Sequence, residues 1–129
     1  MILTGHEIER LVREGSIVID PFDPNQINPN SYNYRLDYKM LVPDPNTTAD
    51  PYVNGRIPEL TIPNEGYVFQ PNRVYLASTI EVIGSEHYVP FLIGRSSLGR
   101  LGVFLQISAD LGNLGAIHRW TLEIVVARG

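Results

Sequence analysis

The sequence contains no cysteine, so disulfide bridges and zinc sites built from thiolates are excluded. This absence fits the reducing cytoplasm, where we expect the protein to be located. No apolar run approaches the roughly 18 residues that a membrane-spanning helix needs, and polar residues follow Met1-Ile2-Leu3 directly, so no signal peptide is visible. The net charge of −4 lacks the basic excess typical of general nucleic-acid-binding proteins. We therefore expect neither a membrane nor a nucleic acid as partner.

The composition is that of an ordinary globular chain, with 43% hydrophobic and 19% charged residues. At 129 residues, the chain has the length of one domain with a sizeable core. Its 10 prolines and 11 glycines break it into short pieces, which favours strands and turns over long helices. Many short strands at regular spacing predict a mainly β fold, either a sandwich or a barrel.

The one clear helix is predicted over residues 4–14. Thr4 is a good N-cap, and Glu7 stands three residues later at the spacing of a capping box. Leu11 belongs to an apolar face, and Gly15 suits the end of the helix. A helix of this length is marginal alone, so we expect it to dock on the rest of the chain.

The strands are predicted from alternating or apolar runs between turn residues. Residues 43–58 are rich in Pro, Asn, Thr and Asp, and we expect them to form a surface excursion and the most disordered stretch. The predicted strands cover residues 16–20, 32–42, 60–62, 67–69, 73–83, 103–108 and 118–126.

Residues 94–102 stand out, because three glycines, two arginines and two serines lie between apolar runs. Such residues suit a turn that presents N–H, O–H and guanidinium donors to an anion. Ser96 or Ser97 can cap a short helical turn that faces a phosphate, and Arg95 and Arg100 can each bind phosphate oxygens. The residue types alone leave open a plain turn with one surface ion pair.

A second candidate site residue lies in the last predicted strand. Leu122 and Ile124 share one face of this strand, whereas Glu123 lies on the other face with Thr121. A carboxylate within an apolar strand needs a partner or is held in its neutral form. Glu123 is therefore either a functional acid or a strand-edge glutamate paired with an arginine.

Three parts of the sequence together resemble one family. The central segment Arg-Ser-Ser-Leu-Gly-Arg-Leu-Gly, residues 95–102, looks like the signature of the dCTP deaminases, which belong to the trimeric dUTPase superfamily. The opening, residues 1–4, 17–22 and 27–36, and the late segment 121–124 are similar to that family in the same order. The resemblance implies a dUTPase-like distorted jelly-roll or barrel with one short N-terminal helix. It also implies a homotrimer with active sites at subunit interfaces, to which a neighbouring subunit contributes.

The resemblance also assigns roles to residues. Glu123 would be the catalytic acid–base group, Ser96 and Arg100 would orient water and stabilise developing charge, and the backbone of Ala109 would read the pyrimidine ring. The expected nucleotide-binding residues are Arg95, Ser96, Ser97, Leu98, Gly99, Arg100, Ala109, Asn113, Thr121, Leu122 and Glu123.

The implied reaction is hydrolytic deamination of dCTP to dUTP, in pyrimidine deoxynucleotide metabolism. No catalytic metal is expected, and Mg²⁺ would enter only as a companion of the triphosphate. The sequence agrees to the extent that the zinc deaminase signature requires cysteines, which this chain lacks.

The chain departs from the family at several positions. Asn113 and Asn33 stand where the family or a related motif often has Asp, and Ala116 replaces a usual aromatic. The family also continues with further strands and a tail over the nucleotide, so we expect a single domain, residues 1–129, without these parts. These departures favour a non-catalytic nucleotide-binding or regulatory module as the alternative. Hydrolysis of the dUTP diphosphate bond is a weaker alternative, because Asn113 is a poor base.

Overall fold

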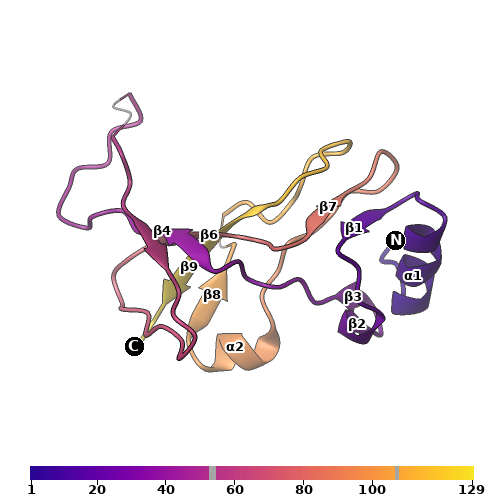
Figure 1. Cartoon of the computed structure of the whole chain (residues 1–129), viewed down its shortest axis with the longest axis horizontal. Helices are drawn as coiled ribbons and strands as arrows, with labels where there is room; N and C mark the ends of the chain where they lie inside the picture. The colour runs from indigo at the N-terminus through magenta and orange to yellow at the C-terminus, as the bar shows by residue number, and fades with distance from the viewer. Residues whose placement is uncertain (53–54, 107) are drawn as a thin grey trace. The chain divides into compact units, whose positions relative to one another are not determined.

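The computed structural model describes residues 1–52, 55–106 and 108–129. As the composition predicted, it is mainly β with few helices (Figure 1). The chain divides into two compact units, which are described separately. The first unit contains Met1–Leu36, Thr79–Leu92 and Ala109–Trp120, and the second contains Asp37–Ser78, Ile93–Ser108 and Thr121–Gly129. None of the described helices is both long and apolar enough to span a membrane.

The predicted N-terminal helix is confirmed as α1, Gly5–Arg13, in the first unit. The Thr4 hydroxyl oxygen accepts a hydrogen bond from the Glu7 backbone N–H at 3.3 Å, as expected for an N-cap. Gly15 has a φ of 87°, a conformation that glycine adopts without steric cost, so the helix ends there. Leu11 is 2% exposed and anchors the apolar face of the helix.

Short antiparallel pairs make up the strands of the first unit. Strand β1, Val18–Asp20, pairs with β7, Val82–Gly84. Strand β2, Ile27–Asn28, pairs with β3, Ser31–Tyr32, after the short 3₁₀ helix η1, Pro24–Gln26.

An ion pair with a buried carboxylate ties two segments of the first unit together. The Glu81 side chain is fully buried, and one of its oxygens accepts from Arg35 Nε at 2.8 Å. Its other oxygen accepts from the Arg35 backbone N–H at 2.9 Å. The hydrogen bond to Glu81 raises the pKa of Arg35 above the ordinary arginine value.

The second unit contains a five-stranded antiparallel sheet with strand order β5-β4-β6-β9-β8. Apolar side chains form its core, with Tyr75 0%, Leu122 1% and Met40 2% exposed. The strands, in that order, are β5 Glu59–Thr61, β4 Lys39–Leu41, β6 Tyr75–Ser78, β9 Thr121–Val126 and β8 Val103–Leu105.

Three strand predictions are wrong. The predicted strand 73–83 divides into β6, Tyr75–Ser78, and β7, Val82–Gly84, which belong to different sheets. Residues 32–42 do not form one strand. Strand β3 ends at Tyr32, strand β4 covers Lys39–Leu41, and the chain between them is irregular. Residues 67–69 are extended but belong to no strand. There the rings of Tyr67 and Phe69 pack edge-on against Tyr75, whose hydroxyl accepts from the Gln70 backbone N–H at 2.8 Å. The apolar run at residues 67–69 therefore reflects this packing and not a strand.

Other strands are shorter than predicted. The first starts at Val18, the last starts at Thr121, and β8 ends at Leu105. Ile107, within the predicted strand 103–108, lies outside the described residues. The described residues of the excursion 43–58 contain no helix or strand and are mostly exposed, which confirms its surface position; Val53 and Asn54 lie outside the described residues.

Candidate active site

The glycine- and arginine-rich motif forms a short helix, α2, Ser96–Arg100, in the second unit. Its N-cap is Arg95 and makes no side-chain capping bond, so the prediction that Ser96 or Ser97 caps the helix is wrong. Ser96 and Ser97 are instead the first two helical residues. Their hydroxyls are therefore not used as caps.

Packing against β8 fixes the position of α2 (Figure 1). A Cβ added at Gly94, just before the helix, would lie 3.7 Å from the Leu105 side chain. After the helix, Gly102 has a φ of 81° and its carbonyl accepts from the Ala127 N–H at 2.8 Å. The chain therefore enters α2 over the Leu105 end of β8 and leaves it beside the end of β9.

The polar side chains of the motif are exposed. Arg95, Ser96, Ser97 and Arg100 all lie on the surface of the second unit. Among the described residues, neither arginine forms an ion pair. The alternative of a plain turn with one surface ion pair is thus not what the described chain shows. Two uncompensated cations and two hydroxyls remain available to an anion.

Glu123 lies in the middle of β9, opposite Leu76 of β6. Burial alternates along β9 as predicted, with Leu122 and Ile124 buried and Glu123 half-buried on the other face. Within the described part of the chain, the Glu123 carboxylate takes part in no ion pair. The alternative of a structural Glu–Arg pair at this position is therefore not observed. A Glu–Arg pair with a buried carboxylate is instead found at Arg35–Glu81, which the sequence analysis did not predict.

Gln106 is the polar residue that directly contacts the Glu123 backbone. Its side-chain oxygen accepts from the Glu123 N–H at 2.6 Å, and its own N–H donates to the Glu123 carbonyl at 3.2 Å. The sequence analysis did not single out Gln106. The only signal was a polar residue near the end of an apolar run.

The remaining predicted site residues fall in different settings. Thr121 is exposed at the start of β9, whereas Leu122 is 1% exposed, so its side chain serves the core. Leu98 and Gly99 are half-buried in α2. Two further predicted residues, Ala109 and Asn113, are exposed residues of the first unit. Ala116, which stands in place of the usual aromatic, is half-buried there.

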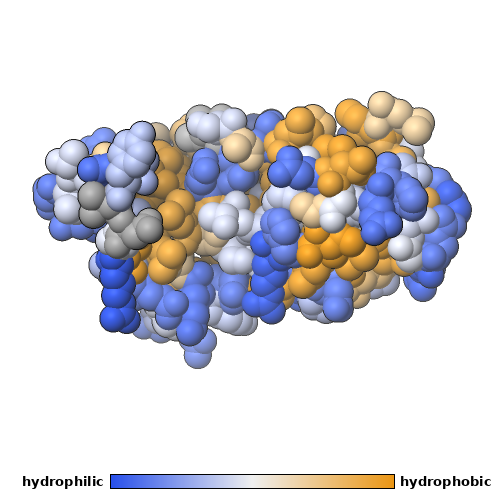
Figure 2. All heavy atoms as spheres, turned by 90° about the horizontal axis from the view of Figure 1, so that it is seen from above, coloured by the Kyte–Doolittle hydropathy of each residue, from blue (hydrophilic) through white to orange (hydrophobic). Residues whose placement is uncertain are grey.

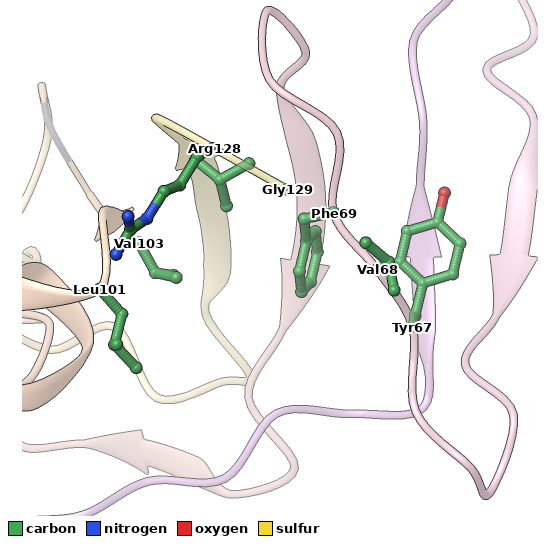
Figure 3. Close-up of a pocket in the computed structure, with 8 residues that line it drawn as sticks. Tyr67, Val68, Phe69, Leu101, Val103, Arg128 and Gly129 are labelled. Carbon is green, nitrogen blue, oxygen red and sulfur yellow. The ribbon is translucent and has the colours of Figure 1, made fainter.

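Two surface pockets of the second unit are lined by other residues. One, of about 330 Å³, lies between Phe69 and Arg128 and includes Leu101 and Val103 (Figure 3). The other, of about 380 Å³, is lined by Asp44, Arg73 and neighbouring side chains. None of the predicted site residues lines either pocket. In the described ranges no three His, Asp or Glu side chains cluster as metal ligands; metal-independent chemistry stays a prediction.

Comparison with known proteins decides the family. A family model described as dCTP deaminase-like matches residues 2–128. The chain belongs to the dCTP deaminase-like family. The resemblance read from the sequence is thereby confirmed across nearly the whole chain.

Relatives within the family agree with this assignment. A protein of Hathewaya histolytica is 46% identical over 124 residues, which cover 96% of this chain and 71% of the relative. A protein of Clostridium acetobutylicum is 45% identical, with 96% and 70% covered. Both are named "dCTP deaminase, dUMP-forming". The prediction of a dCTP deaminase-like hydrolase agrees with these names, but the expected product, dUTP, is not confirmed.

A solved structure supports the fold. The crystal structure of 2'-deoxycytidine 5'-triphosphate deaminase from Agrobacterium tumefaciens matches with a TM-score of 0.73 and 21% identity. The match covers 97% of this chain and 42% of that chain. This confirms the predicted mainly β, dUTPase-like fold class. The second helix, α2, is an addition to the one helix that the sequence predicted.

Proposed function

We propose that this protein catalyses the hydrolytic deamination of dCTP. The observation that carries the proposal is that a member of the dCTP deaminase-like family keeps the Arg-Ser-Ser-Leu-Gly-Arg segment, with its arginines and serines exposed, and Glu123 in one compact unit. Among the described residues, neither the motif arginines nor Glu123 is used in a structural ion pair.

The motif is proposed to hold the triphosphate. Arg95 and Arg100 supply forked guanidinium donors, and Ser96 and Ser97 supply hydroxyl donors at the start of α2. Charge-assisted hydrogen bonds of this kind are the strong ones in proteins. Because these side chains are exposed and form no ion pair with a carboxylate of the described residues, binding an anion requires no ion pair seen there to be broken.

Glu123 is the proposed acid–base group. Its carboxylate takes a proton from water while the water oxygen bonds to C4 of the cytosine ring, and the proton passes to N3. Glu123 then carries the proton of the new C4 hydroxyl to the amino group, so that the C4–O double bond forms as the C4–N bond breaks and ammonia leaves. Ser96 and Arg100 are proposed to orient the water and stabilise the charge that develops.

The proposed end product is dUMP, in agreement with the names of the relatives. This requires a second hydrolysis, in which water attacks the α-phosphorus and pyrophosphate leaves. Asn113 argues against this second hydrolysis, because an amide cannot serve as the base that a carboxylate would supply. Formation of dUTP therefore tests the deamination, and formation of dUMP tests the second hydrolysis.

We also propose that the chain works as a homotrimer in the cytoplasm, as the sequence analysis expected. Hydrophobic residues form large areas on the face shown in Figure 2. In the first unit the exposed apolar side chains include Val89, Phe91, Leu111, Leu114 and Ile117. Burial of such side chains against a second copy would be favourable. Sedimentation equilibrium showing a monomer at micromolar concentration would oppose this part of the proposal.

The experiment is to incubate the protein with dCTP and separate the products by ion-exchange chromatography, with dUTP as a parallel substrate. Ammonia and dUMP are the expected products. Accumulation of dUTP would support the proposed deamination and refute the proposed second hydrolysis. Bound dCTP without turnover would refute the enzyme and favour the non-catalytic nucleotide-binding module. A parallel reaction with EDTA tests metal dependence, and we expect deamination to persist.

A further inference from the structure

The pairing of β8 with β9 ends at an unusual place. The register runs from Val103 opposite Val126 to Leu105 opposite Ile124. The next pair would be Gln106 opposite Glu123, but Gln106 has a φ of 52°, in the left-handed region that non-glycine residues rarely adopt. The backbone therefore turns out of the strand at the position opposite Glu123.

The Gln106 side chain completes the pair that its backbone leaves unfinished. In a regular hydrogen-bonded antiparallel pair, each residue donates its N–H to the carbonyl of the other. Gln106 donates to the Glu123 carbonyl at 3.2 Å in the usual way. The return bond, from the Glu123 N–H, goes at 2.6 Å to Oε1 of the Gln106 side chain.

We infer that Gln106 is a positioning residue for Glu123. This inference rests on the proposed function, in which the Glu123 carboxylate moves the protons. Because both hydrogen bonds act on the Glu123 backbone, they fix the Cα position from which the carboxylate projects. Misplacement of a reacting group by about 1 Å can lower a rate about 100-fold, so the return bond is expected to act on turnover.

Two substitutions at residue 106 separate the effect of its hydrogen-bond acceptor from the effect of its side-chain size. Methionine has a similar length and lacks a strong acceptor at this point. Glutamate keeps an oxygen where Oε1 lies and adds a negative charge. The pair Gln106→Met and Gln106→Glu therefore isolates the acceptor from the volume of the side chain.

The test compares these variants with Gln70→Met as the matched control. Gln70 lies in the same unit and is exposed, and its side chain donates a long 3.5 Å bond to the Val68 carbonyl. We expect Gln106→Met to lower kcat for dCTP about 10- to 100-fold while KM changes less than about twofold. Gln70→Met should leave both values unchanged. Amide hydrogen exchange should accelerate at Glu123 in Gln106→Met but not in the control.

Gln106→Glu provides the rescue. Its carboxylate should restore protection of the Glu123 amide and most of the plateau kcat. A role of Gln106 that does not act through the Glu123 backbone would not give this joint recovery of amide protection and kcat.

The outcomes separate the two proposals. Absence of deamination in the wild-type protein refutes the proposed function, and the positioning role falls with it. Wild-type deamination with an unchanged kcat in Gln106→Met overturns the positioning role alone. The same holds if kcat falls without faster exchange at Glu123, or if Gln70→Met loses as much activity as Gln106→Met.

Discussion

The buried carboxylate of Glu81 gives the sharpest stability prediction. Its side chain is 0% exposed, and its two oxygens accept from the side chain and the backbone N–H of Arg35 at 2.8 and 2.9 Å. The substitution Glu81→Gln keeps the shape but removes the charge and turns one acceptor into a donor. One of the two Arg35 donors then loses its partner. Hydrogen bonds to charged groups contribute about 1.5–3 kcal/mol, so we expect a loss of about that size.

Urea unfolding followed by tryptophan fluorescence measures this effect. The only tryptophan, Trp120, lies in the same unit as Glu81 and donates from its indole N–H to the Ile83 carbonyl at 2.8 Å. The matched control is Glu9→Gln, which removes an ion pair with Arg13 on the surface of α1. If both variants unfold at the same urea concentration, the buried pair contributes no more than a surface pair, and the reasoning is refuted.

Three further predictions concern the core, alkaline stability and nucleotide binding. Leu122→Ala should lower the free energy of unfolding by about 2–5 kcal/mol, and Val125→Ala on the other face of β9 should cost clearly less in the same urea titration. Burial raises the pKa of Tyr34, so its contribution to stability is complete below the ordinary value of 10.0 and is lost as the pH rises through the raised value; Tyr34→Phe should lessen the alkaline loss of melting temperature. Arg95→Ala should weaken dCTP binding about 10-fold or more by calorimetry, whereas Arg128→Ala, an exposed arginine outside the motif, should leave it unchanged.

Local sequence rules were sufficient for two elements. The cap at Thr4 and the stop at Gly15 depend on neighbouring residues only, and α1 was predicted within one residue at each end. The alternation from Leu122 to Val126 likewise identified the buried face of β9, because a central strand with one buried face repeats every two residues.

Tertiary contacts decided what sequence rules missed. Tyr67 and Phe69 lie in an apolar run like that of a strand, yet their rings pack on Tyr75 and residues 67–69 belong to no strand. A short apolar run indicates that side chains of the segment are packed. It does not by itself show that the backbone is hydrogen-bonded to a neighbouring strand. For the same reason, residues 32–42 were predicted as one strand, although β3 and β4 are separate strands.

The candidate site shows the same division. The donors of the motif and Glu123 were identified from residue types and resemblance. The role of Gln106 depends on a positive φ and on a hydrogen bond across the sheet, neither of which a sequence displays. The start of α2 was predicted wrongly because serine is preferred at the N-cap position. In the structure Arg95 is the last extended residue and occupies that position without a side-chain capping bond.

The central claim is that Glu123 carries the deamination of dCTP. The most direct measurement is ammonia release from dCTP by the wild-type protein and by Glu123→Gln, with dCTP binding measured by calorimetry for both. We predict ammonia release by the wild type, loss of at least about 100-fold in Glu123→Gln because a general base is removed, and dCTP affinity within about threefold. Ammonia release by Glu123→Gln at the wild-type rate would contradict the role assigned to Glu123, and no release by either protein would contradict the proposed function.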